Sequence, residues 1–173
     1  SASIASVFGI VFSLYVIFGE KYTLSISGSS FLNFAFVADR LSAFFILSMI
    51  FVVTASNAVM FLIVWELMSV ISYFLVIYEH EKPETRKAGF IYIVMTHIGT
   101  GFIILSFLIL TDGSGSFNFD SMSGVSLPPL LKDLVFIFAL IGFGTKAGIV
   151  PLHIWLPYAH PAAPSNVSAL MSG

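Results

Sequence analysis

The sequence predicts an all-α polytopic membrane protein, a bundle of transmembrane helices with one broken helix near Pro151. Of its 173 residues, 58% are hydrophobic and only 9% are charged, whereas soluble domains carry about 25% charged residues. The apolar residues gather in runs that approach the roughly 20 residues of a membrane span. These runs show little of the period-two alternation that a transmembrane β-strand requires, which favours helices over a β-barrel.

Five apolar runs are the predicted spans, and a polar stretch separates the first two. The spans cover residues 4–18, 41–55, 58–78, 88–110 and 134–150. Residues 19–36 are rich in Ser and Gly and contain short alternating runs. Such a pattern is typical of a β-hairpin, which we expect at the membrane surface.

Beyond the fifth span, the prolines predict an interrupted helix. A broken or short helix is expected over residues 151–160, and a further helix is expected to begin at residue 165 and run to 173. We expect the whole chain to form a single transmembrane domain. Because it opens with Ser1 and stops at Gly173 inside an apolar pattern, we expect it to be a fragment of a larger subunit.

Composition also excludes several kinds of site. The chain has no cysteine, which rules out disulfides, thiolate zinc sites and iron–sulfur ligation within it. His153 and His160 are seven residues apart with Pro157 between them and no carboxylate nearby, so no metal site is expected. The net charge is −2 and no basic patch indicates nucleic acid. The lipid bilayer is the expected surrounding.

The loops indicate an orientation. Residues 79–87 hold three of the seven basic residues, whereas residues 111–129 hold none. Because basic loops remain on the cytoplasmic side, we expect the first loop in the cytoplasm and the second outside.

Two charges, Glu66 and Lys146, lie well inside apolar runs. A charge at the centre of a membrane helix costs about 2.5 to 3.5 kcal/mol on insertion scales. We therefore expect them to form a titratable pair on an ion path, since burial favours release of a lysine's proton and a nearby carboxylate favours its retention. The alternative is a structural ion pair that fixes helix packing.

Histidines and helix breakers supply the other candidate residues. His97 lies mid-span, where a packing role is as plausible as a relay role. His153 follows Pro151, where a disrupted helix frees carbonyls that bind water, and is the better relay candidate. For His160, which lies between two prolines, a structural role is at least as plausible. The candidate break residues are Gly148, Pro151 and Pro157, and the break either lines an ion-binding cavity or serves only packing.

Three long motifs carry a family resemblance. "FLIVWELMSVISYFLVIYEHE", "GFIYIVMTHIGTGFIIL" and "GFGTKAGIVPLHIWLPYAHPAAPSNVSALMSG" resemble the antiporter-like membrane subunits of respiratory complexes. That family includes the large proton-pumping subunits of NADH–quinone oxidoreductase and subunits of multisubunit cation/proton antiporters. "MTHIGT" and "AHPAAPS" are most similar to membrane subunits of formate hydrogenlyase and energy-converting hydrogenases, the hydrogenase component B type. The resemblance covers residues 58–173, and residues 37–53 resemble an earlier helix of the family.

The resemblance implies a function. Glu66 would pair with Lys146 in proton translocation, and His153 and His160 would help to connect the proton path. The chain itself would hold no redox cofactor. Partner membrane and peripheral redox subunits, carrying iron–sulfur clusters and a nickel–iron centre or flavin, would perform the electron chemistry at the cell inner membrane. The alternatives are a subunit of a Na⁺/H⁺ antiporter, with the same Glu66–Lys146 device, and a non-pumping membrane scaffold.

The join between the second and third spans departs from the family. In the family, a connection and most of another helix separate the "ADRLSAFF" and "WELMS" helices, which here are nearly contiguous. Both helices should run from outside to inside, which adjacent spans cannot do. We therefore predict that a segment is missing near residues 53–57. A continuous helix–turn–helix would argue against this and would reverse the placement of the 79–87 loop.

Overall fold

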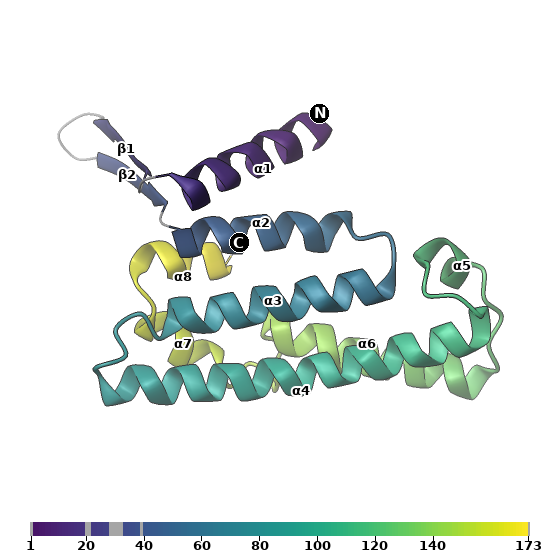
Figure 1. The fold of residues 1–173 in the computed structure, drawn as a ribbon. Helices are drawn as coiled ribbons and strands as arrows, with labels where there is room; N and C mark the ends of the chain where they lie inside the picture. Colours follow the sequence, from purple (N-terminus) through teal and green to yellow (C-terminus); the bar gives the residue numbers. More distant parts are fainter. Residues whose placement is uncertain (1, 20–21, 28–32, 39, 173) are drawn as a thin grey trace.

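The protein folds as a bundle of helices with one small hairpin (Figure 1). The computed structural model describes residues 2–19, 22–27, 33–38 and 40–172. In chain order, the elements are α1 (Ala2–Phe18), β1 (Tyr22–Ser27), β2 (Asn33–Ala38), α2 (Arg40–Thr54), α3 (Ala58–Val76), α4 (Pro83–Ser114), α5 (Phe119–Ser123), α6 (Pro129–Ala147), α7 (Leu156–Ala162) and α8 (Ser165–Ser172). The predicted helical class is confirmed.

The long helices lie over the predicted apolar runs. Among the described residues, α3 and α4 are long and apolar enough to cross a membrane, and α1 and α2 are shorter apolar helices. α4 has 32 residues, longer than the predicted run 88–110. It starts at Pro83. Proline suits the first helical position because it lacks an N–H, and an N–H at this position would have no partner within the helix. α4 ends where Gly115 adopts the left-handed conformation (φ 66°). That each of these helices crosses a bilayer stays a prediction.

The two strands form the hairpin expected between the first two spans. β1 and β2 pair antiparallel, from Tyr22 opposite Ala38 to Ser27 opposite Asn33. Part of the predicted stretch, residues 20–21 and 28–32, lies outside the described residues.

α4 and α6 pack closely against each other, and glycines permit this. A Cβ built on Gly142 of α6 would lie 2.5 Å from Cγ1 of Ile103 and 2.8 Å from the carbonyl oxygen of Gly99, both on α4. Small residues of this kind let membrane helices approach closely. The core continues between α3, α4 and α7, where Tyr92, Leu75 and Trp155 are buried.

The connection between α2 and α3 is a continuous helix–turn–helix. α2 ends at Thr54 and α3 begins at Ala58, with the Asn57 side chain accepting a hydrogen bond from the Met60 N–H at 2.8 Å. The Ala58 N–H also donates to the carbonyl of Phe117, near α5, at 2.9 Å. In this chain, α2 and α3 thus run antiparallel as neighbours (Figure 1), and the missing segment near residues 53–57 stays a prediction.

The helix break begins earlier than Pro151. α6 ends at Ala147, and Gly148 terminates it in the left-handed conformation with φ 74°. Residues 149–155 form turns, after which Pro157 lies in the first turn of α7. The predicted short helix over residues 151–160 is thus displaced to Leu156–Ala162, because a left-handed glycine ends a helix by itself. α8 begins at Ser165 as expected.

Candidate functional site

Lys146 lies in the last turn of α6 and points between α3 and α4. Its ammonium donates hydrogen bonds to the hydroxyl of Ser69 on α3 at 3.1 Å and to the hydroxyl of Tyr92 on α4 at 3.0 Å. It also lies 5.3 Å from the ring centroid of Tyr92 and 5.9 Å from that of Trp65. Ser69 and Tyr92 are fully buried, and Lys146 is half-buried. We call these four residues the Lys146 site; within it, hydroxyls and aromatic faces surround a cation.

Glu66 does not pair with Lys146 in this structure. Among the described residues, the ion-pair partner of Glu66 is His97 on α4, with 3.3 Å between Oε2 and Nε2. No carboxylate of the described chain lies within the 4.0 Å ion-pair distance of the Lys146 ammonium. The pairing expected from opposite charge is therefore replaced by two separate polar contacts.

Helix geometry explains the separation. Glu66 precedes Ser69 by three residues, so their levels on α3 differ by about 4.5 Å. On the antiparallel α4, His97 follows Tyr92 by five residues, which displaces it in the same direction by about 7.5 Å. The Glu66–His97 contact therefore lies about one helical turn farther from the 79–87 loop than the Lys146 site does.

The two ring nitrogens of His97 have different neighbours. Nδ1 lies 2.9 Å from the carbonyl oxygen of Ile93, which can only accept a hydrogen bond. Nε2 lies 3.3 Å from Oε2 of Glu66. His97 thus links the backbone of its own helix, α4, to the Glu66 side chain on α3.

The two histidines beyond the break have different surroundings. Nδ1 of His153 is buried and has no hydrogen-bond partner within the described chain. Nδ1 of His160 is 2.8 Å from the hydroxyl of Ser168, and its ring stacks on Trp155 with centroids 6.4 Å apart. His160 thereby ties α7 to α8, whereas His153 retains an unsatisfied polar atom.

Trp155 joins the break to the Lys146 site. Its indole N–H donates to the carbonyl of Thr145, the residue before Lys146, at 2.7 Å. Its ring meets the ring of Tyr92 edge-on, with centroids 5.2 Å apart. Among the candidate break residues, Gly148 has the most direct effect, because it ends α6 two residues after Lys146.

Sequence reasoning missed the direct partners of Lys146. Ser69 and Tyr92 were visible as polar groups inside apolar runs, and that was the available signal. Their convergence on Lys146 depends on how α3, α4 and α6 face one another. The amino-acid sequence alone does not give this arrangement. Among the residues that the structure describes, no three His, Cys, Asp or Glu side chains gather in a group that could hold a metal.

Comparison with known proteins supports the motif resemblance. Residues 55–173 match the family described as NADH:quinone oxidoreductase/Mrp antiporter, transmembrane. Hydrogenase-4 component B of Escherichia coli (strain K12) is 47% identical over 129 residues, which is 75% of this chain and 19% of that protein. NADH-quinone oxidoreductase subunit N of Polaromonas naphthalenivorans (strain CJ2) is 26% identical over 171 residues, 95% of this chain and 33% of that protein. The chain thus spans a fifth to a third of these relatives.

Two solved structures share the fold. A chain of the membrane-bound sulfane sulfur reductase, an archaeal respiratory membrane complex, matches with a TM-score of 0.69 and 20% identity, over 76% of this chain and 27% of that chain. A chain of respiratory complex I from Thermus thermophilus matches with a TM-score of 0.64 and 17% identity, over 98% of this chain and 44% of that one. The helical arrangement is therefore that of a membrane subunit of such complexes.

Proposed function

The chain belongs to the NADH:quinone oxidoreductase/Mrp antiporter transmembrane family, and from this premise we propose that it forms part of a proton-translocating subunit of a respiratory oxidoreductase complex. Its identity with hydrogenase-4 component B favours a hydrogenase-type complex, and the likeness to subunit N keeps the NADH–quinone type as the neighbouring case. In this proposal, the protein resides in the inner membrane. Other membrane subunits and peripheral redox subunits, with iron–sulfur clusters and a nickel–iron centre or flavin, drive it.

The observation that carries the proposal is the ammonium of Lys146, held between three helices by neutral groups. A hydroxyl both accepts and donates hydrogen bonds. Ser69 already donates its hydrogen to the carbonyl of Trp65 at 3.0 Å, so Ser69 accepts from Lys146 as an ammonium, and the Tyr92 hydroxyl can also donate to Lys146 as an amine. A site built for a permanent charge would instead supply a carboxylate. Lysine suits such a cycle because, unlike arginine, it releases its proton readily when buried.

In this mechanism, the position of the Glu66 side chain determines whether Lys146 keeps or releases its proton. When its side chain leaves His97 and approaches Lys146, the negative charge favours retention of the proton on Lys146. When it returns to His97, the lysine is left among neutral groups and release becomes favourable. The offset between the two contacts is about one helical turn, so a change of side-chain rotamer with a small helix shift can switch between the two states.

The break gives the released proton a direction. Lys146 ends α6 beside Gly148, and His153 follows in the turns after the break. The buried, unsatisfied Nδ1 of His153 is a group that a water chain or a moving side chain could join to the lysine. We assign His153 as the next proton station and His160, with its Ser168 and Trp155 contacts, as a packing residue of the same segment.

The test uses the complete complex in inverted membrane vesicles, with a fluorescent dye that reports the proton gradient. We expect Lys146→Ala to abolish pumping with the complex assembled, and Glu66→Gln to lower pumping. Lys132→Ala, at an exposed position in the first turn of α6, is the matched control and should pump normally. Normal pumping by an assembled Lys146→Ala complex would overturn the proposal. Loss of assembly alone would favour the scaffold.

A further inference from the structure

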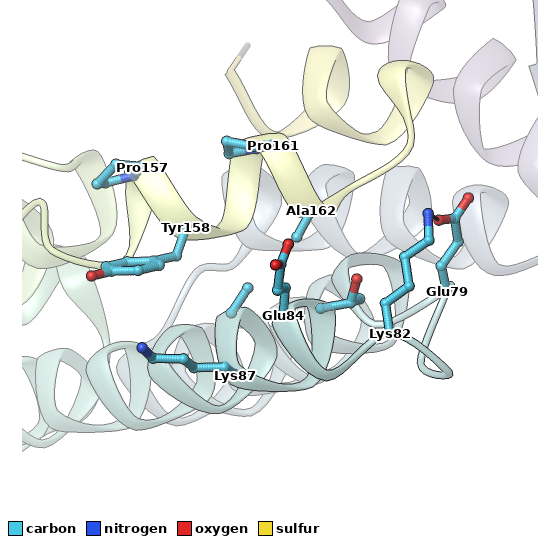
Figure 2. Close-up of a pocket in the computed structure, with 10 residues that line it drawn as sticks. Glu79, Lys82, Glu84, Lys87, Pro157, Tyr158, Pro161 and Ala162 are labelled. Atoms are coloured by element: carbon cyan, nitrogen blue, oxygen red, sulfur yellow. Dashed lines mark hydrogen bonds and ion pairs between the residues drawn. The ribbon is translucent and has the colours of Figure 1, made fainter.

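A cavity of about 430 Å³ lies between the start of α4 and α7, separate from the Lys146 site. Its wall on one side is the stretch from Glu79 to Ala88, and on the other side the prolines and Tyr158 of α7. Figure 2 shows Tyr158 beside Lys87, with Glu84 and then Lys82 toward the start of α4. No residue of the Lys146 site lines this cavity, and its volume falls in the range of small-ligand pockets.

Two acidic and two basic side chains line the cavity, and one of each forms an ion pair. Glu79 and Lys82 form an ion pair with each other, and Glu79 raises the pKa of Lys82, first through their hydrogen bond and then through its charge. Glu84 has no ion pair within 4.0 Å in the described chain. Lys87 holds its ammonium 5.8 Å from the ring centroid of Tyr158. The charge of Glu84 also raises the pKa of Lys82, as the smallest of the causes. Glu84 and Lys87 thus stand outside the Glu79–Lys82 ion pair and are within reach of a ligand.

Thr85 adds a polar group to the same wall. The residue is 3% exposed and lines the cavity. Its hydroxyl is not among the fully buried polar atoms of the described chain that lack a partner, so it is open to the cavity and can bond to a ligand there. The first N–H groups of α4 also have no side-chain cap. A ligand that accepts hydrogen bonds would satisfy both kinds of donor.

The cavity lies at the level where α4 changes from polar to apolar. Its wall includes the charged residues up to Lys87 and then Ala88, where the long apolar run of α4 begins. If α4 crosses the bilayer, this level coincides with the lipid headgroups. Tyr158 fits that level, because tyrosines gather at membrane–water interfaces.

We propose that this cavity binds the phosphoethanolamine headgroup of a membrane phospholipid. The phosphate lies against Lys87 and the Thr85 hydroxyl, and the ammonium lies against Glu84. Two acidic and two basic side chains balance each other, which suits a zwitterionic headgroup better than an anionic one. A primary ammonium donates hydrogen bonds to a carboxylate, whereas a quaternary choline ammonium has no hydrogen to donate. The inference depends on α4 lying in a membrane and not on proton translocation.

The test measures lipid selectivity of the complete subunit in nanodiscs of equal phosphatidylethanolamine, phosphatidylcholine and phosphatidylglycerol. After partial delipidation, native mass spectrometry counts the lipids that stay bound. We expect phosphatidylethanolamine to be retained about threefold or more over each of the others, as one additional hydrogen bond provides. Equal retention of the three lipids would overturn the proposal without any variant.

Variants locate the site. Glu84→Gln should remove the selectivity, because it removes the carboxylate that distinguishes the primary ammonium. Lys87→Gln and Thr85→Val should lower retention of all three lipids, because the phosphate is common to them, and Lys132→Gln, at the opposite end of the bundle, should change neither. Selectivity that survives Glu84→Gln would refute this location. Soluble glycerophosphoethanolamine at millimolar concentration should fail to displace the lipid; its displacement would show recognition of a free phosphoethanolamine compound and overturn the assignment to membrane lipid. Proton pumping by the same variants, measured separately, tests the other proposal.

Discussion

At the scale of single residues, Tyr92 holds the Lys146 site together through two different contacts. Its hydroxyl receives the Lys146 hydrogen bond at 3.0 Å, and its ring packs edge-on against Trp155. It is 1% exposed, so water does not replace either contact. The hydroxyl and the ring can therefore be separated experimentally.

Tyr92→Phe removes the hydroxyl and keeps the ring. A hydrogen bond to a charged group contributes about 1.5–3 kcal/mol, so we expect the Lys146 ammonium to be held less firmly between α3 and α4. Pumping in inverted vesicles should fall accordingly, with assembly unchanged. Tyr78→Phe, at an exposed position at the end of α3, is the control. Equal pumping by both variants would contradict the role assigned to the Tyr92 hydroxyl.

Residue chemistry was readable in the sequence, whereas residue pairing was not. Glu66 and Lys146 stand out because each is a charge inside an apolar run, and that argument needs no structure. Their partners, His97 for Glu66 and Ser69 with Tyr92 for Lys146, follow from the relative depth of three helices. Depth depends on packing between helices, which local sequence does not encode.

At the scale of elements, the contact between α4 and α6 depends on glycine. A Cβ on Gly142 would meet the backbone carbonyl of Gly99 at 2.8 Å, and backbone cannot move aside as a flexible side chain can. Overpacking of this kind costs about 1–3 kcal/mol. Gly142→Ala should therefore lower the thermal unfolding temperature of the purified protein by several degrees.

The matched control for Gly142→Ala is Gly101→Ala on α4. No atom lies within 4 Å of a Cβ at Gly101, and alanine is better than glycine in a helix by about 1 kcal/mol. Its unfolding temperature should stay equal or rise. A decrease of the same size in both variants would show that close helix approach is not the cause.

The break at Gly148 is the second element-scale prediction. With φ 74° and Leu156 Cδ1 only 2.6 Å from a built Cβ, Gly148→Ala should cost about 1–2 kcal/mol for the left-handed conformation alone. We expect lower thermal stability together with impaired pumping, because the residue two positions earlier is Lys146. Gly124→Ala, at φ −98° with open space around it, should leave both measurements unchanged.

The elements also show what the sequence could predict about the fold. Run length and composition were sufficient to locate α3, α4, α6 and the β1–β2 hairpin. The break was expected near Pro151, with Gly148 and Pro157 as further candidate residues. In the structure, the left-handed conformation of Gly148 ends α6 three residues before Pro151. A glycine can continue a helix or end it. The packing of Leu156 against Gly148 is part of the tertiary structure, so the sequence alone does not show which of the two occurs.

At the scale of the whole molecule, the continuous α2–α3 hairpin fixes which chain segments share an end of the bundle. Arg40 begins α2 and Glu81 follows α3, so the two residues lie at the same end (Figure 1). That end carries four of the seven basic residues, Arg40, Lys82, Arg86 and Lys87, and the opposite end carries Lys132. The positive-inside rule then assigns the Arg40 end to the cytoplasm, whereas the helix orientation of the family, combined with a helix–turn–helix, would place this end outside.

Cysteine labelling tests this topology, since residues 1–173 contain no cysteine. Single variants Arg40→Cys, Glu81→Cys and Asp120→Cys all place the thiol at exposed positions. In right-side-out vesicles, a membrane-impermeant maleimide should label Asp120→Cys and leave the other two unlabelled. In inverted vesicles, the pattern should reverse. The unsubstituted protein is the background control.

The same labelling distinguishes the hairpin from a chain that lacks a membrane span between α2 and α3. If α2 and α3 both ran from outside to inside, Arg40→Cys and Glu81→Cys would react from opposite sides, and the missing-segment prediction would be supported. Labelling of both from the same side supports the hairpin. If that shared side proves to be the outside, the topology follows the helix orientation implied by the family resemblance and not the positive-inside rule applied to the 79–87 loop. The proton path through Lys146 would then run with its break toward the outside.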